Sequence, residues 1–162
     1  MTQIKKSVTA VLVIAALTCL TACDSTTQES THTAAALQTA SQETQAQQTM
    51  QVTDEQGTKV TVQLNGSPAA QSLAAQLPMD IDIENYSTNE KIFYPSQKLD
   101  TQQTPRAANK VGTLAYYEPW GDVVFFYGAF RPNEDLYALG QITEDSQTIA
   151  KLSGRVHLEL VP

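Results

Sequence analysis

The chain has 162 residues and is acidic, with 17 Asp and Glu against 10 Lys and Arg and a formal net charge of -7. This balance argues against nucleic-acid binding, because phosphate backbones are bound by basic surfaces. The two cysteines, Cys19 and Cys23, both lie near the N-terminus, so no disulfide, thiolate metal site or cysteine nucleophile is expected in the remainder. Because the chain also has no glycine-rich phosphate loop and no zinc-ligand spacing, we expect neither a metal nor another cofactor.

The N-terminus has the order of segments found in secretory signal peptides. Two lysines precede an apolar run over residues 8–20, which is long enough for a signal peptide and short for a membrane span. Residues 20–23 then read Leu-Thr-Ala-Cys. This pattern resembles the lipobox of bacterial lipoprotein precursors, which implies cleavage before Cys23 and attachment of lipid, such as palmitate, to that cysteine. We therefore expect residues 1–22 to be a lipoprotein signal peptide, and the mature protein to be lipid-anchored in the cell envelope, on the extracytoplasmic side of a membrane.

A tether is expected between the lipid and the folded domain. From Asp24 to residue 49 the chain is mostly Thr, Gln, Ser and Ala, with Leu37 as its only large apolar residue. Such a segment cannot bury enough apolar surface to offset its ordering entropy, so residues 23–49 are predicted to be disordered. Aspartate directly after the cysteine resembles an inner-membrane retention signal in envelopes with two membranes and would mean nothing in a single-membrane organism. The sequence leaves that choice open.

The pattern changes at residue 50, where the predicted domain 50–162 begins. Apolar residues alternate with polar ones over residues 50–64 on both sides of a turn at Gly57, which predicts a β-hairpin. Ser67 and the proline after it suit the start of a short amphipathic helix, which ends at Pro78.

Two shorter strands follow. Residues 79–84 have strict period two, with three carboxylates on the outward face, which we interpret as a solvated face rather than a calcium site. Residues 91–94 form the next predicted strand, and residues 96–110 are expected to be a surface loop.

The richest apolar patterning lies in the second half of the domain. Strands are predicted over residues 112–117 and 123–127, with a turn between them, and over 136–142, where Gly140 is expected to break the strand. Residues 130–135 are a predicted loop.

The chain is expected to end with a helix and a strand. Asp145 or Ser146 can cap a short helix through residue 152, and Gly154 suits its C-terminal end. In the closing strand, residues 156–160, His157 falls on the polar face, where we expect it to partner a carboxylate on the neighbouring strand.

Many short strands and two short helices favour a mainly β fold. A closed barrel of about eight strands is economical because closure removes exposed strand edges. An α/β sandwich with both helices on one face is the alternative.

Three stretches resemble the bacterial cyclophilin-like family of small β-barrels. They are residues 91–95 (Lys-Ile-Phe-Tyr-Pro), 114–121 (Leu-Ala-Tyr-Tyr-Glu-Pro-Trp-Gly) and 136–140 (Leu-Tyr-Ala-Leu-Gly). The resemblance covers the chain from about residue 50 onward and implies a closed cyclophilin-like β-barrel with two helices.

Cyclophilins isomerise the peptide bond before proline, with an apolar pocket for the proline ring and an arginine. By resemblance, Phe126 falls at the phenylalanine of that pocket, and Tyr117 falls where a small residue lines the groove. We expect Phe93 and Trp120 to complete an aromatic ligand-binding groove, with Arg131 as a stand-in for the catalytic cation.

The family's Phe-His-Arg run is absent, and Lys91 is the only cation in the corresponding region. A lysine cannot present the planar fork of an arginine. Two hypotheses therefore remain. The first is a module that binds a peptide, protein or small ligand without efficient catalysis, and the missing arginine favours it. The second is a peptidyl-prolyl isomerase with an altered active site, in which Arg131 is the catalytic candidate.

Consecutive residues of a strand point to opposite faces, so one of Phe125 and Phe126 must belong to the barrel core. Trp120 lies in a turn and is the better candidate for an exposed residue; the alternative is a buried tryptophan that connects the turn to the core. Both hypotheses would weaken if Phe126 pointed into the barrel with no cleft beside it.

Overall fold

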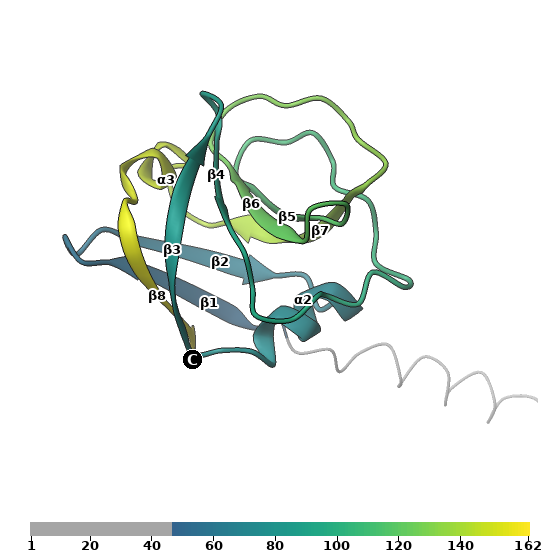
Figure 1. Cartoon of the computed structure of the whole chain (residues 1–162), viewed down its shortest axis with the longest axis horizontal. Helices are drawn as coiled ribbons and strands as arrows, with labels where there is room; N and C mark the ends of the chain where they lie inside the picture. The colour runs from purple at the N-terminus through teal and green to yellow at the C-terminus, as the bar shows by residue number, and fades with distance from the viewer. Residues whose placement is uncertain (1–46) are drawn as a thin grey trace, which may run out of the picture. The chain divides into compact units, whose positions relative to one another are not determined.

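The computed structural model describes residues 47–162, so the expected signal peptide, Cys23 and most of the expected tether lie outside the described residues. Eight antiparallel strands close into a single barrel in the order β1-β2-β7-β5-β6-β4-β3-β8 (Figure 1). The predicted mainly β, closed barrel with two short helices is therefore confirmed, and the sandwich alternative is wrong. The strands are β1 (Thr49–Asp54), β2 (Lys59–Leu64), β3 (Met79–Tyr86), β4 (Glu90–Phe93), β5 (Thr113–Tyr117), β6 (Asp122–Phe126), β7 (Leu136–Ile142) and β8 (Gly154–Val161), and the helices are α2 (Pro68–Ala74) and α3 (Gln147–Lys151).

The first hairpin forms as its periodicity predicts. Val52 of β1 pairs with Val60 of β2, and the turn between the strands places Gly57 at a φ of 82°, a conformation that glycine adopts without a steric penalty. The carboxylate of Asp54 accepts hydrogen bonds from the backbone N–H groups of Gln56 and Thr58, at 3.0 and 2.7 Å, which stabilises the turn.

Both helices begin with side-chain capping. The hydroxyl of Ser67 accepts a hydrogen bond from the N–H of Ala70 at 3.3 Å at the start of α2. At α3, Asp145 provides the cap, because its carboxylate accepts from the N–H of Gln147 at 3.0 Å, whereas Ser146 makes no side-chain cap bond.

The barrel interior holds the larger of two apolar clusters. Inward-facing residues of the strands meet there with the buried side chains of α2 and of the α3 region, including Leu73, Ile149 and Leu152. Phe93 and Phe125 pack against each other at this centre, with ring centroids 5.8 Å apart. A smaller cluster lies on the other face of the sheet and is formed by Ile92, Ala107, Ala115, Val124, Phe126 and Leu136.

The sequence pattern predicted that Gly140 breaks the strand over residues 136–142, and this prediction is wrong. The strand continues through Gly140, which pairs with Leu64 of β2 and Leu114 of β5, although its register with β5 shifts next to this pair, between Leu114 and Ala115. A Cβ atom at this position would collide with the backbone carbonyl of Gln63. The glycine is therefore needed for the close approach of β2 and β7, and not to end a strand.

The segment between β4 and β5 is more than the predicted surface loop. Thr104 and Ala107 are buried, and the N–H of Ala107 donates to the carbonyl of Leu136 at 2.9 Å. The guanidinium of Arg106 lies 3.9 Å from the centre of the Tyr137 ring. This segment therefore pairs with the edge of β7 through an antiparallel bridge between Arg106 and Tyr137.

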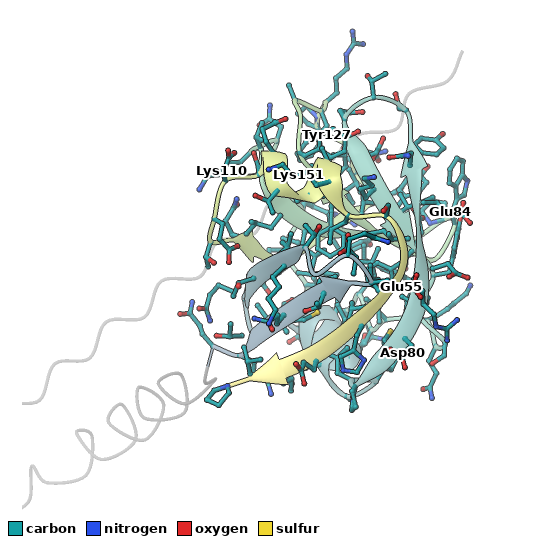
Figure 2. All side chains as sticks on the ribbon, turned by 90° about the vertical axis from the view of Figure 1, so that its left-hand side faces the viewer. Glu55, Asp80, Glu84, Lys110, Tyr127 and Lys151 are labelled. Carbon is teal, nitrogen blue, oxygen red and sulfur yellow. The ribbon has the colours of Figure 1, made fainter. Side chains whose placement is uncertain are left out.

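His157 has the partner that its position on the polar face predicted. It pairs with Asp80 across β8 and β3, with 2.8 Å between His157 Nδ1 and Asp80 Oδ1, and Glu159 Oε2 lies 3.9 Å from its Nε2. Asp80 and Glu84 lie on the outside of the barrel (Figure 2), as the period-two pattern of β3 requires. Within residues 47–162, no helix has the length and apolar character needed to span a membrane.

Candidate functional site

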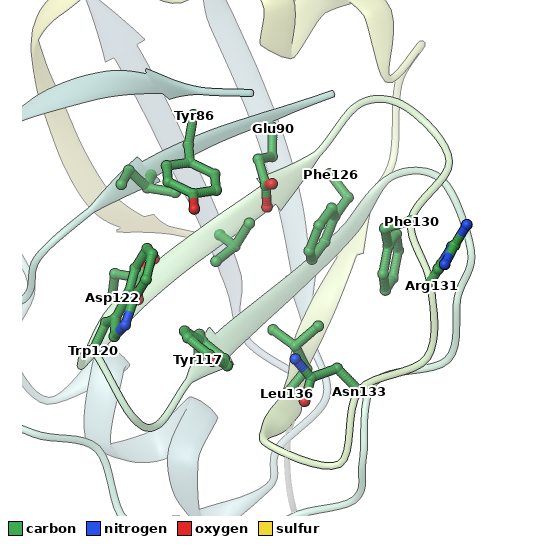
Figure 3. Close-up of a pocket in the computed structure, with 12 residues that line it drawn as sticks. Tyr86, Glu90, Tyr117, Trp120, Asp122, Phe126, Phe130, Arg131, Asn133 and Leu136 are labelled. Carbon is green, nitrogen blue, oxygen red and sulfur yellow. The ribbon is translucent and has the colours of Figure 1, made fainter. Parts of the chain in front are cut away.

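A pocket of about 290 Å³ lies on the outer face of the sheet, over β4, β5 and β6 (Figure 3). We call it the outer-face pocket. Its lining combines aromatic, aliphatic and polar or charged side chains. They come from these strands, from β3, from the start of β7 and from the two loops that flank β6: Tyr86, Glu90, Ile92, Tyr117, Trp120, Asp122, Val124, Phe126, Phe130, Arg131, Asn133 and Leu136.

Strand alternation explains how these residues come together. On β6, Asp122, Val124 and Phe126 share the outer face, while the residues between them belong to the interior cluster. Glu90 and Ile92 of β4 lie on the same outer face, and Glu90 pairs directly with Phe126.

The apolar floor is packed from side chains that the barrel interior does not use. Phe126 is only 3% exposed, and the ring of Phe130 from the following loop stacks on it, with centroids 3.7 Å apart and an interplanar angle of 15°. Val124 and Leu136 are buried beside them. This packing holds the loop after β6 against the sheet.

Three aromatic residues, Tyr86, Tyr117 and Trp120, form an aromatic rim. The indole of Trp120 meets both tyrosine rings edge to face, at centroid distances of 5.4 Å to Tyr86 and 5.5 Å to Tyr117. Trp120 is nevertheless 52% exposed. A large apolar group that is this exposed and held in place by its neighbours is suited to contact a ligand.

Two carboxylates with perturbed pKa values face the same pocket. Asp122 is 2% exposed, its Oδ1 has no hydrogen-bond partner among the described residues, and burial raises the pKa of its carboxyl above the usual 3.8. Burial, and to a lesser extent the charge of Asp122, raises the pKa of Glu90 above its usual 4.5. Such shifts are common at functional sites because these sites hold charge away from water.

Arg131 supplies the positive charge in the lining. It is exposed on the loop after β6, and Phe130 lies between it and Phe126. Its guanidinium points away from Glu90 and Asp122 (Figure 3). The two carboxylates are therefore not paired with it in this structure.

A sequence model of the Cyclophilin-like family matches residues 53–161. The chain belongs to this family. No curated protein sequence matches it. Among solved structures, the cyclophilin-like barrel is similar to the solution structure of the hypothetical protein AF2241 from Archaeoglobus fulgidus, with a TM-score of 0.54 and 17% identity over 73% of this chain and 98% of that one. It is also similar to McbB, solved in complex with tryptophan, with a TM-score of 0.54 and 9% identity over 68% of this chain and 44% of that one. At these identities the two likenesses show the fold alone.

Four of the residues predicted for the site line one pocket of the cyclophilin-like barrel. Phe126, Tyr117 and Trp120 contribute to its floor and aromatic rim, and Arg131 lies at one end. Phe126 faces outward and has a cavity beside it, so the arrangement that would have weakened both hypotheses is not the one observed. Phe125 is the core residue of the pair.

Phe93 is not in the pocket. It is 1% exposed and packs in the barrel interior against Phe125. On β4, Glu90 and Ile92 point outward, and Lys91 and Phe93 point inward. Phe93 therefore lies on the opposite face of the sheet from the other residues predicted for the site.

Lys91 likewise cannot replace the family's arginine at the pocket. Its Nζ donates a hydrogen bond to the backbone carbonyl of Leu152, at 2.6 Å, on the inner side of the sheet. Burial lowers the pKa of Lys91. Lys91 therefore attaches the end of α3 to the barrel.

Sequence reasoning missed Glu90 and Asp122. A signal for Asp122 was present, because it lies four residues before Phe126 and so on the same face of one strand. Glu90 lies outside the predicted strand 91–94, and only the pairing of β4 with β6 brings it to the pocket. Among residues 47–162, no group of three or more His, Cys, Asp and Glu is arranged to hold a metal ion.

Proposed function

We propose that this protein is a membrane-anchored, extracytoplasmic lipoprotein whose cyclophilin-like barrel binds a peptide or small ligand in the outer-face pocket, without efficient catalysis. The observation that carries the binding proposal is the pocket itself. It combines the exposed indole of Trp120 with a packed apolar floor at Phe126 and a volume of about 290 Å³, close to the lower end of typical ligand sites.

The membrane proposal rests on the N-terminal sequence. Two lysines, the apolar run 8–20 and the Leu-Thr-Ala-Cys ending at Cys23 support cleavage and lipid attachment. The acidic balance of the chain makes flat binding to anionic lipid unfavourable, so the acyl chains would supply the attachment.

A fragment titration monitored by nuclear magnetic resonance tests ligand binding. Full-length protein in detergent micelles is titrated with small neutral and charged fragments and with short peptides, and we expect shifts confined to the outer-face pocket. Trp120→Ala should weaken binding about tenfold or more, because truncating an aromatic hot-spot residue costs about 2 kcal/mol or more. Leu160→Ala is the control, since Leu160 of β8 is also an exposed large apolar residue but does not line the pocket. Shifts that avoid the pocket for every fragment and peptide would contradict the proposal.

Proline isomerisation is the second candidate, and the presence of Arg131 in the same pocket as Phe126 is the observation that favours it. Catalysis would require a donor held against the proline nitrogen, and Arg131 lies on an exposed loop with its guanidinium turned outward (Figure 3). We therefore expect the full-length protein to leave the isomerisation rate of a proline peptide at the uncatalysed value. A faster rate that Arg131→Ala abolishes would establish the isomerase instead, with Phe126→Ala as the variant that tests the proline pocket.

A further inference from the structure

The buried carboxylate of Asp122 is an unmet hydrogen-bond acceptor in the outer-face pocket. Its Oδ1 has no partner among the described residues, although the side chain is 2% exposed and lines the cavity. An unpaired buried acceptor costs free energy, and this cost is greater for a charged group. Because Oδ1 itself has almost no accessible surface, a ligand that brings a donor to the carboxylate recovers that cost once the Asp122 side chain turns toward the cavity.

The surroundings of Asp122 favour a positive ligand. Glu90 faces the same pocket, and Glu84, on the outer face of β3, pairs with Ile92, which lines the pocket. The positive charge in the lining, Arg131, is turned away from Glu90 and Asp122 (Figure 3). Clefts lined by one sign of charge concentrate ligands of the opposite sign.

The aromatic rim supplies a second attraction of the same kind. Tyr117 pairs directly with Asp122 across β5 and β6, and Trp120 precedes Asp122 by two residues. Tyrosine and tryptophan ring faces attract cations, most strongly where water is excluded. Carboxylate and rings thus surround the same part of the pocket.

We propose that the outer-face pocket recognises an alkylammonium group that carries N–H donors, with Asp122 as its acceptor and the aromatic rim around it. This inference rests on the proposed ligand-binding function and names the class of ligand. A quaternary ammonium would satisfy the rings but has no N–H for Asp122. A peptidyl proline has no N–H donor either, so the same observation disfavours proline as the natural occupant. The ammonium belongs to a free amine or to a lysine side chain of a peptide.

Trp120 gives the experiment a built-in reporter, because it is the only tryptophan of the chain and lies at the aromatic rim. Its fluorescence is followed in the full-length protein at neutral pH during titration with n-butylammonium and with a blocked Gly-Lys-Gly peptide. The same peptide with acetyl-lysine removes the charge, and with trimethyl-lysine it removes the donors. We expect saturation by the ammonium probes. The two modified peptides should bind at least about tenfold more weakly than the lysine peptide, because one lacks the charge and the other lacks the N–H donors for Asp122.

Two variants test the role of Asp122. Asp122→Asn should weaken ammonium binding about tenfold or more, because it removes the charge from the acceptor while keeping the shape. Asp82→Asn makes the same charge change on an exposed residue outside the pocket lining and should leave binding within about twofold at physiological salt. Equal affinity of butylammonium and the lysine peptide supports a free amine as ligand, and tighter binding of the peptide supports a lysine side chain.

The inference is overturned if the acetylated or trimethylated peptide binds as tightly as the lysine peptide, or if Asp122→Asn leaves ammonium binding unchanged. It is also overturned if neutral fragments fill the pocket and the ammonium probes do not, in which case the proposed ligand-binding function stands. Absence of binding by every amine probe and every fragment would contradict both this inference and the proposed ligand-binding function.

Discussion

Asp122 keeps a carboxylate buried on the outer face of β6, in a position that costs folding free energy. Burial raises its pKa, so the folded state holds the proton more tightly than the unfolded state does. A raised carboxyl pKa means that stability falls as the pH rises from the unfolded value of 3.8 through the folded one. The pKa of Glu90 shifts in the same direction and adds to this effect. The pKa of Tyr94 is raised chiefly by burial and then by the charge of Asp122.

We expect Asp122→Asn to raise the free energy of unfolding at neutral pH, because the amide is neutral at every pH. The gain should shrink as the pH falls toward 3.8, where the wild-type carboxyl is itself protonated. Urea unfolding of the full-length protein at a series of pH values measures this difference, with Asp82→Asn as the exposed control. A gain that is independent of pH, or that grows in acid, would contradict the assignment of a buried charge.

At the scale of elements, the seam between β2 and β7 depends on a backbone contact that leaves no room for a side chain. Gly140 pairs with Leu64, and a Cβ atom would collide with the carbonyl of Gln63 in β2. The neighbouring strand cannot move away easily, because β2 is also paired with β1 in the closed barrel.

Gly140→Ala should therefore destabilise the protein by about 1–3 kcal/mol, the usual cost of adding a methylene-sized group where the packing leaves no space. Gly57→Ala is an informative comparison, since nothing lies within 4 Å of a Cβ there and only the positive φ of 82° opposes it. That strain costs roughly 1–2 kcal/mol and should leave the seam intact. Amide hydrogen exchange at β2 and β7, measured together with urea unfolding, distinguishes the two variants. Unchanged exchange at the seam in Gly140→Ala would contradict the role of Gly140 in the close approach of β2 and β7.

At the scale of the whole molecule, the proposed protein is a barrel with the outer-face pocket that is attached to a membrane by lipid at its N-terminus. A single acyl chain holds a protein to a membrane only marginally, so stable anchoring needs more than one chain. The one residue on which this attachment depends is Cys23, which lies outside the described residues.

Cys23→Ser should abolish acylation and release the protein from the membrane fraction, because serine lacks the thiol to which lipid is attached. Intact mass spectrometry of the purified protein measures the loss of the acyl mass. Cys19→Ser is the matched control, since Cys19 lies inside the apolar run and is removed with the signal peptide if cleavage occurs before Cys23. Acyl mass retained in Cys23→Ser, or absent from the wild type, would refute the anchor.

The sequence alone determined those features that depend on near neighbours in the chain. The hairpin turn at Gly57, the start of α2 at Ser67 and the period-two strands follow from local backbone preferences, and the family motifs at 114–121 located Tyr117 and Trp120. These local rules apply within a few residues, so they hold in any surrounding fold.

Only the tertiary structure decided which face of each strand is the inner one. Alternation assigns Phe93 and Ile92 to opposite faces, but barrel closure decides that Phe93 enters the core and that Ile92 joins the pocket. Strand pairing also brings Glu90 beside Phe126, although 36 residue positions separate them in the numbering of the chain. The period of a strand is a local property, whereas its phase and its partners depend on how distant segments bury their apolar surface together.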